Sequence, residues 1–285
     1  MFFRFLLLFF INICFYSKIF SVDPIIISEK INKKISRTFQ NMSYSPKGDP
    51  IFFCLSLPEK IPNEGLTCII VMAGLATGQK NLEYIEDPKN FVFIGYEYPS
   101  ILRKKNKSIF DFYMIRKKTL HIPLDILDII QWIKKQSWSN KKVSIAGFSF
   151  GAMFVPNIYH ETQKEDIALG PGIIAFAGAD IYPLLKINLP GNKLTKSINA
   201  CIASYLLESI EPSKHLPYLK NDFLIINGKY DDYIPFDQAK KLQDLTPYPK
   251  TIINLETSHL SPTNKKQLKT INHICDKWFD EKLNH

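Results

Sequence analysis

The pentapeptide GFSFG at residues 147–151 follows the apolar run 143–146 and precedes a helix-like stretch at 152–163. It matches the pattern G-x-S-x-G, in which a serine lies on a sharp turn between a strand and a helix. Glycine at both ends suits such a turn, because the two backbones come close together there and leave little room for side chains. Ser149 is therefore a candidate nucleophile, and its alternative interpretation is a turn serine that caps the following helix.

A serine hydroxyl attacks a carbonyl carbon efficiently only when a general base takes its proton and a third group orients that base. Asp231 and then His259 follow later in the chain, each just after a short apolar run typical of a strand. The order serine, aspartate, histidine at successive strand ends favours His259 as the base and Asp231 as the orienting acid. Asp180 is an alternative acid, and Asp232 could instead cap the next helix.

Three features together resemble the α/β-hydrolase superfamily: the GFSFG motif, the segment GKYDDYIP at 228–235, and His259 after the last apolar run. The segment resembles the superfamily pattern G-x-x-D-x-x-[VI]-P, and its spacing selects Asp231. The resemblance covers about residues 50–280. It implies an acyl-enzyme mechanism without a cofactor, in which Ser149 is the nucleophile, His259 the base and Asp231 the group that orients the base.

The resemblance also implies an oxyanion hole built from two backbone N–H groups. One belongs to Phe150, the residue after the nucleophile. The other comes from the loop AGLATG at 73–78, which lacks the histidine that the superfamily commonly carries there. We expect Leu75 to supply this donor, with Ala76 as the alternative, and we expect Phe148 and Ala76 to contact the substrate.

Short apolar runs alternate with helix-like stretches along the chain, which is typical of an α/β fold with a mostly parallel central sheet and helices on both faces. We interpret residues 22–285 as one α/β-hydrolase domain in which 178–222 is long enough to form a small cap, while 22–50 could add edge strands. The predicted strands are residues 51–57, 67–72, 91–96, 143–146, 173–177, 223–226 and 251–255.

Two prolines shape the expected helices. One helix is predicted to start near Pro123, because the isoleucines that follow it form a single apolar stripe at positions 126, 129, 130 and 133. Pro156 lies inside the helix expected at 152–163 and predicts a kink or an early helix end there. The loop 97–121 contains the apolar stretch 109–115, which could form a lid over an acyl chain or a helix packed on the sheet.

The N-terminal residues 1–21 are typical of a targeting segment, because Arg4 precedes an apolar run at 5–16 that is too short for a membrane span. They predict a signal peptide, or a membrane anchor if they are not cleaved. We therefore expect an exported protein, secreted or periplasmic. Export would permit disulfides among the four later cysteines, although buried free thiols are the alternative: Cys54, Cys68, Cys201 and Cys275.

The formal net charge of +9 suits a protein near anionic membrane surfaces or acidic ligands. No nucleic-acid-binding motif accompanies this charge, so we expect a lysine-rich surface and no nucleic-acid partner. The chain has neither C-x-x-C nor H-E-x-x-H, and we expect no metal.

The leading hypothesis is an exported serine hydrolase that cleaves a small-molecule ester or a lipid. A peptidase, a thioesterase or an acyltransferase could use the same residues. A non-catalytic binding protein at a membrane surface, or a membrane-tethered structural protein, would need no reactive Ser149.

Overall fold

The computed structural model describes residues 23–85, 91–104 and 109–283. The predicted targeting segment at 1–21 lies outside these described residues. Within them, no helix combines the length and the apolar character that crossing a membrane requires.

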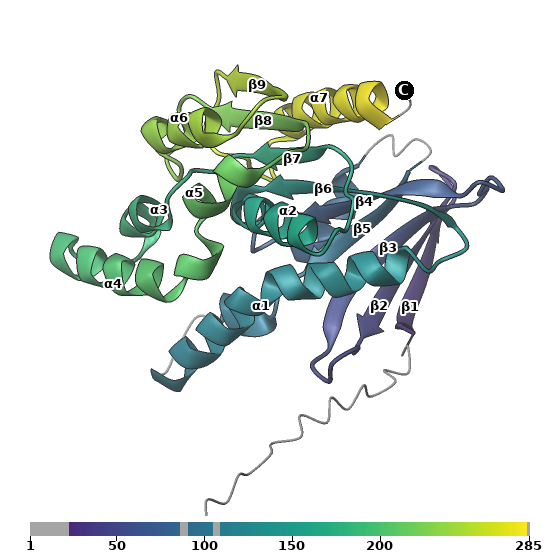
Figure 1. The fold of residues 1–285 in the computed structure, drawn as a ribbon, viewed down its shortest axis with the longest axis horizontal. Helices are drawn as coiled ribbons and strands as arrows, with labels where there is room; N and C mark the ends of the chain where they lie inside the picture. Colours follow the sequence, from purple (N-terminus) through teal and green to yellow (C-terminus); the bar gives the residue numbers. More distant parts are fainter. Residues whose placement is uncertain (1–22, 86–90, 105–108, 284–285) are drawn as a thin grey trace, which may run out of the picture.

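The described chain forms one nine-stranded sheet in the order β1-β2-β3-β5-β4-β6-β7-β8-β9 (Figure 1). Neighbouring strands from β5 to β9 in this order run parallel, while β1, β2 and β3 add an antiparallel edge. The strands are β1 Ile25–Asn32, β2 Arg37–Tyr44, β3 Ile51–Pro58, β4 Leu66–Met72, β5 Val92–Glu97, β6 Ser139–Phe148, β7 Gly172–Ala175, β8 Phe223–Gly228 and β9 Lys250–Leu255.

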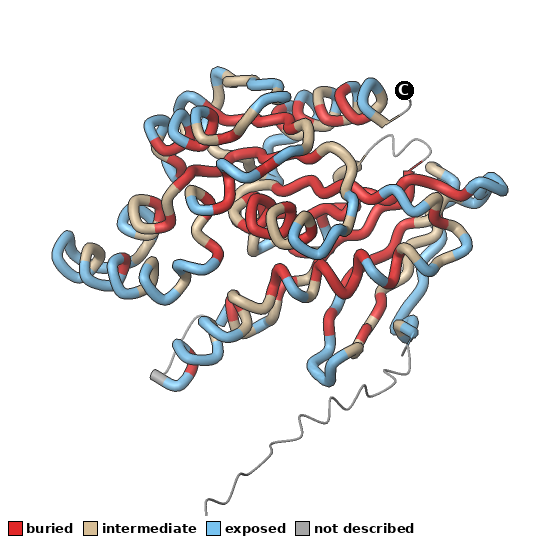
Figure 2. Tube along the Cα trace, in the orientation of Figure 1, coloured by how far each residue is buried: buried red, intermediate tan, exposed pale blue. Residues whose placement is uncertain are grey.

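All seven predicted strands are present, and 22–50 supplies the two edge strands that the sequence left open. The central strands are buried along nearly their whole length, as Figure 2 shows, because both faces of the sheet are covered. One face packs against α1 Ile109–Ile133 and α2 Val155–Lys164. The other packs against the 3-10 helix η1 Gly78–Tyr84 and α7 Lys265–Leu283.

The predicted start of a helix near Pro123 is wrong. Helix α1 begins at Ile109 and contains Pro123 in its interior. Proline removes only one backbone hydrogen bond, and buried side chains hold the helix to the sheet on both sides of it, including Ile122 before and Ile126 after. The stretch 109–115 is therefore the first part of this helix rather than a separate lid.

The prediction that Pro156 kinks or ends a helix is also wrong. A 3-10 helix, η3 Ser149–Met153, follows the serine, and α2 begins only at Val155. Pro156 thus lies in the first turn of α2, where its missing N–H costs no intrahelical hydrogen bond.

Residues 178–222 form a helical insertion between β7 and β8. It consists of α3 Ile181–Asn188, α4 Lys193–Leu206 and α5 Pro212–His215, with the 3-10 turns η4 Glu208–Ile210 and η5 Leu216–Tyr218. After β8, α6 Phe236–Leu245 leads back to β9. The four cysteines of the described chain are free thiols, and of these only Cys201 is exposed.

Candidate active site

Ser149 lies directly after β6 in a strained turn. Its backbone φ of +55° is in the left-handed region, which residues other than glycine rarely adopt. The flanking glycines are required by space: a Cβ at Gly147 would lie 2.4 Å from a methyl group of Val155, and one at Gly151 would lie 2.1 Å from the Met72 carbonyl oxygen. This geometry turns the Ser149 side chain out at the carboxyl end of the sheet.

Ser149, His259 and Asp231 come together although they are far apart in the sequence. The Ser149 hydroxyl oxygen lies 2.7 Å from His259 Nε2, and His259 Nδ1 lies 2.7 Å from Asp231 Oδ2. The three residues follow the ends of β6, β9 and β8, which are parallel strands that finish at the same edge of the sheet. The sequence order therefore becomes a spatial cluster.

The hydrogen bonds determine which His259 nitrogen carries the proton. An ionised carboxylate only accepts hydrogen bonds, so His259 Nδ1 is the N–H that donates to Asp231. In the neutral imidazole, Nε2 is then left with a lone pair, and the Ser149 hydroxyl donates to it. This is the arrangement in which the imidazole can take the serine proton.

The Asp231 carboxylate is fixed from two sides. Its Oδ1 accepts from the backbone N–H groups of Tyr233 at 2.8 Å and Ile234 at 2.9 Å, while Oδ2 faces His259. The Asp231 side chain is only 1% exposed, whereas Asp232 is exposed. The alternative acid Asp180 forms an ion pair with Lys241 instead.

The loop that carries His259 is held by Gln267 of α7, which is buried. The Gln267 amide donates to the Ser258 carbonyl oxygen at 3.0 Å and to the Thr257 hydroxyl at 2.9 Å. Aromatic rings of Phe176 and Tyr233 pack against the imidazole. Sequence reasoning missed Gln267, because nothing in its local pattern distinguishes it from other polar residues of a helix.

The loop 73–78, expected to supply an oxyanion donor, is anchored from β5 and the segment that follows it. The Tyr98 hydroxyl donates to the Ala73 carbonyl oxygen at 2.7 Å, and Arg103 Nε donates to the Leu75 carbonyl oxygen at 2.6 Å. Arg103 also pairs with Glu97. Arg103 is 28 residues from Leu75 in the sequence, and only the fold brings it to this loop.

Two N–H groups of this loop are already used. The backbone N–H groups of Thr77 and Gly78 both donate to the Gly74 carbonyl oxygen, at 3.0 and 3.1 Å. Leu75 and Ala76 precede them and lie beside Ser149 in the wall of one cavity.

A cavity of about 280 Å³ is lined by Ser149 and His259. Phe148 and Ala76, the expected substrate contacts, are both in its wall. Phe150 is not, because its ring packs against Tyr98 and Phe154 on the opposite face of the sheet. The two phenylalanines that flank the nucleophile therefore point to different faces. In an extended strand, residues two apart would share a face, so the difference comes from the sharp turn at Ser149.

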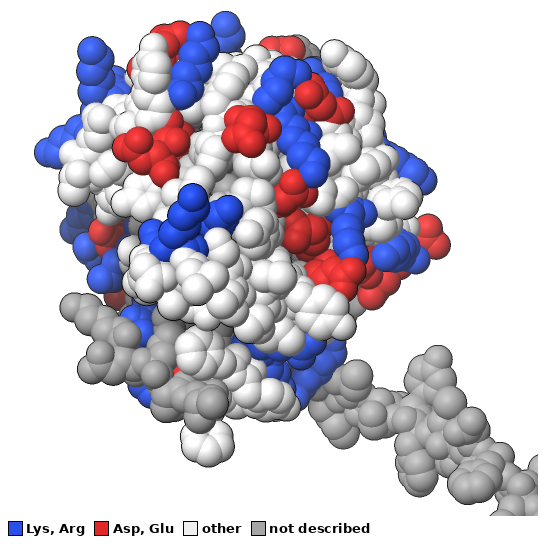
Figure 3. Space-filling model, turned by 90° about the vertical axis from the view of Figure 1, so that its left-hand side faces the viewer, with Lys and Arg blue, Asp and Glu red and all other residues white. Residues whose placement is uncertain are grey.

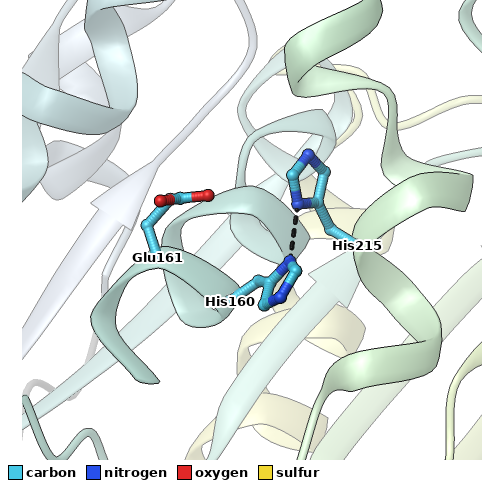
Figure 4. Close-up of side chains that lie close together, drawn as sticks. All are labelled: His160, Glu161 and His215. Atoms are coloured by element: carbon cyan, nitrogen blue, oxygen red, sulfur yellow. Dashed lines mark hydrogen bonds between the residues drawn. The ribbon is translucent and has the colours of Figure 1, made fainter. Parts of the chain in front are cut away.

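A second cluster of titratable side chains joins α2 to α5 (Figure 4). His160 Nδ1 lies 2.9 Å from His215 Nδ1, and His215 Nε2 lies 2.8 Å from the Ser209 carbonyl oxygen and 3.1 Å from the Asn157 amide nitrogen. His215 Nε2 donates to this carbonyl, so in the neutral ring Nδ1 accepts from His160.

Each of His160, Glu161 and His215 could offer one metal-ligand atom, and these atoms lie within 4.8 Å of one another. The Lys164 ammonium, however, lies 2.9 Å from the Glu161 carboxylate and places a positive charge beside the cluster. We therefore interpret the histidine pair as a hydrogen-bonded link between the helix after the nucleophile and the 178–222 insertion.

This link predicts a loss of stability in mild acid. Burial, with a contribution from the Lys164 charge, lowers the pKa of His160, and burial lowers the pKa of His215, from an ordinary value of about 6.5. Below that value the unfolded chain binds more protons than the folded one, so the free energy of unfolding falls as the pH falls. We expect His215→Gln to flatten this fall, measured by urea unfolding between about pH 7 and pH 5.

The matched control is His273→Gln, at an exposed position of α7. It should leave the dependence of the free energy of unfolding on pH unchanged. Glu211 titrates nearby with the opposite sign, because burial raises its pKa to about 7 and stability falls as the pH rises through that value. Glu211 is present in every variant, so its contribution cancels when the pH dependence of two variants is compared. An unaltered slope in His215→Gln would show that the pair does not titrate as the geometry indicates.

Sequence comparison finds one partial match. The model of the X-Pro dipeptidyl-peptidase (S15 family) matches residues 117–182, which run from α1 through the Ser149 turn to the start of α3. This is less than a quarter of the chain. Comparison with curated proteins finds no match.

Solved structures match most of the fold. Acetyl xylan esterase 1 from a Thermoanaerobacterium species superimposes with a TM-score of 0.62 at 14% identity, covering 88% of this chain and 87% of that one. Est1E from Butyrivibrio proteoclasticus with bound ferulic acid gives 0.62 at 14%, covering 84% and 98%. An acetyl xylan esterase from a Paenibacillus species gives 0.61 at 12%, covering 88% of both. The chain has the α/β-hydrolase fold, and the expected fold class is confirmed.

Proposed function

We propose that the protein is a serine hydrolase that cleaves carboxylic esters through an acyl-enzyme. The observation that carries this proposal is the hydrogen-bonded series from Ser149 through His259 to Asp231, at a strained turn beside a cavity. His259 takes the proton as the Ser149 oxygen attacks the ester carbonyl, and Asp231 stabilises the imidazolium that forms. His259 then protonates the leaving alcohol, and a water molecule activated by the same base releases the acid.

The tetrahedral intermediate carries a negative oxygen that needs N–H donors held in place beforehand. We assign the backbone N–H groups of Phe150 and Leu75 to this role, with Ala76 as the alternative to Leu75. The contacts of Tyr98 and Arg103 with the carbonyl groups of loop 73–78 support a rigid donor. These two side chains act on the loop and are positioning residues.

An ester is favoured over a peptide as the substrate. The family match to a peptidase is confined to a stretch around the nucleophile turn, which serine hydrolases of different specificity share. The cavity wall is mostly aliphatic and aromatic, so the amide groups of a peptide would find few hydrogen-bond partners in it. The solved relatives named above are esterases, which supports the same choice.

Labelling with a fluorophosphonate probe tests this function. The purified full chain should react with the probe, because a serine activated by a base attacks phosphorus as it attacks a carbonyl carbon. The same preparation should hydrolyse p-nitrophenyl esters. Folded protein that neither reacts with the probe nor cleaves any ester would refute the proposal and favour a non-catalytic binding protein.

We also infer that the protein is exported and works at an anionic membrane surface. The apolar segment at 1–21 supports export. An exposed apolar face supports the membrane: it is formed by Leu194, Ile198, Ile202 and Tyr205 of α4 with Phe110, Phe112 and Tyr113 of α1, and we call it the α1–α4 face. Figure 3 shows a broad uncharged area on this side of the molecule with lysine and arginine side chains near it.

Vesicle binding tests the α1–α4 face. The full chain should bind vesicles that contain anionic lipid, and binding should weaken with salt, because lysine charges attract the surface before apolar side chains insert. Ile198→Glu should reduce binding by roughly tenfold or more. The matched control is Ile25→Glu, a similarly exposed isoleucine on β1, which should bind as the unaltered protein does. Equal binding by both variants would contradict a role for this face.

A further inference from the structure

We propose that the cavity beside Ser149 binds the acyl chain of the substrate, and that the enzyme prefers esters of medium-length aliphatic acids. This inference rests on the proposed function and adds the class of substrate to it. The cavity runs from Ser149 into the interior, between the sheet and the layer formed by η1 and α7. The substrate alcohol would then lie on the outer side of Ser149.

The sheet side of the cavity is wholly apolar. Its wall consists of Ile69 and Val71 from β4, Phe93 from β5, Ala146 and Phe148 from β6, and Ile173 from β7. These side chains belong to the face that packs against α7. Ala146 is small, whereas its pairing partners are Val71 and Ile173, so the middle of the wall leaves room that larger neighbours would fill.

The opposite side comes from η1 and α7 and has few free polar groups. Ile271, Cys275 and Phe279 lie one helical turn apart along α7 and face the cavity. The amide nitrogen of Asn81 donates to the carbonyl oxygens of Val71 and Gly78, and that of Asn272 donates to the Tyr84 carbonyl oxygen. These two amide donors are therefore engaged within the protein. Asn81 Oδ1 lacks a hydrogen-bond partner among the described residues and Asp276 also lines the wall, while the aliphatic and aromatic surface around them suits methylene groups.

Strand register gives the depth of the cavity. Val71 pairs with Ala146, and Ile69, which also lines the cavity, lies two residues further from the Ser149 edge. Measured along the strand direction, Phe148 and Ile69 are four residues apart. This separation is about 13 Å at about 3.3 Å per residue. A zigzag chain of about ten carbon–carbon bonds, each about 1.5 Å long, spans this distance.

The volume leaves room for a chain longer than an acetyl group. The cavity of about 280 Å³ is many times the roughly 10–15 Å³ that one water molecule needs. An acetyl group would leave most of it unfilled. Each additional methylene that enters the apolar wall should raise kcat/KM by up to about fourfold until the chain reaches the end of the cavity.

The experiment compares kcat/KM for p-nitrophenyl acetate, butyrate, octanoate, decanoate and palmitate with the full chain, alongside fluorophosphonate labelling. We expect a maximum at octanoate or decanoate, roughly tenfold or more above acetate. A maximum at acetate in protein that the probe labels would overturn this inference and leave the hydrolase proposal standing. Absence of both labelling and hydrolysis would remove both.

Variants locate the chain in the cavity. Ile271→Trp fills the space from the α7 side, and Ala146→Leu fills it from the sheet side; each should lower the ratio of octanoate to acetate kcat/KM by roughly tenfold. The matched control is His273→Trp, on the exposed side of α7, which should keep the ratio of the unaltered protein. Ratios that stay unchanged in both cavity variants, with folded and labelled protein, would place the acyl chain elsewhere.

Discussion

Ser149→Ala should lower kcat for p-nitrophenyl ester hydrolysis by about 10⁵-fold or more, which leaves a residual rate about 10³- to 10⁴-fold above uncatalysed hydrolysis. The variant removes the hydroxyl that His259 activates for attack on the ester, while the cavity and the backbone N–H groups remain. Initial rates with active-site titration measure the loss. Fluorophosphonate labelling should disappear together with the ester hydrolysis.

The matched control is Ser144→Ala on the same strand. Ser144 is buried, and its hydroxyl has no hydrogen-bond partner in the described structure, so alanine should preserve both fold and activity. His259→Ala should cost about as much as Ser149→Ala, and the double variant little more, because the two groups act as a unit. A Ser149→Ala enzyme that kept most of its activity would show that another residue is the nucleophile.

The sequence was sufficient to predict the fold class and the central strands, because their signals are local. Each buried parallel strand is a short apolar run, and the G-x-S-x-G turn marks the point where β6 ends. The spatial meeting of Ser149, Asp231 and His259 could be anticipated for the same reason, since residues that follow neighbouring parallel strands share one edge of the sheet.

Other features could not be predicted because they depend on contacts between distant segments. Strand β1 is exposed along most of its length and has no buried face to produce an alternating pattern. The sequence predicts too late a start for α1, because Pro123 resembles a first-turn proline when the packing of the preceding turns is unknown. Three side chains support the site by donating to backbone carbonyl groups: Tyr98, Arg103 and Gln267. Every residue has a carbonyl group, so the sequence does not indicate which of them a side chain will contact.

Asp231→Asn should lower kcat by about 10³- to 10⁴-fold and change KM little. The two backbone N–H groups that donate to Oδ1 decide the orientation of the new amide, because only its oxygen can accept from Tyr233 and Ile234. Its NH₂ group must then face His259. A neutral imidazole would accept a hydrogen bond from this NH₂ group at Nδ1 and would carry its own proton on Nε2. Nε2 could then no longer accept the Ser149 proton.

Asp232→Asn is the matched control for this prediction. It changes an adjacent and exposed carboxylate in the same way, and kcat should stay within about twofold of the unaltered enzyme. The rate of fluorophosphonate labelling should follow kcat in both variants, since both depend on proton transfer to His259. Equal losses in the two variants would mean that the loop as a whole matters, rather than the bond between Asp231 and His259 Nδ1. A large loss only in Asp232→Asn would transfer the role of the acid to that residue.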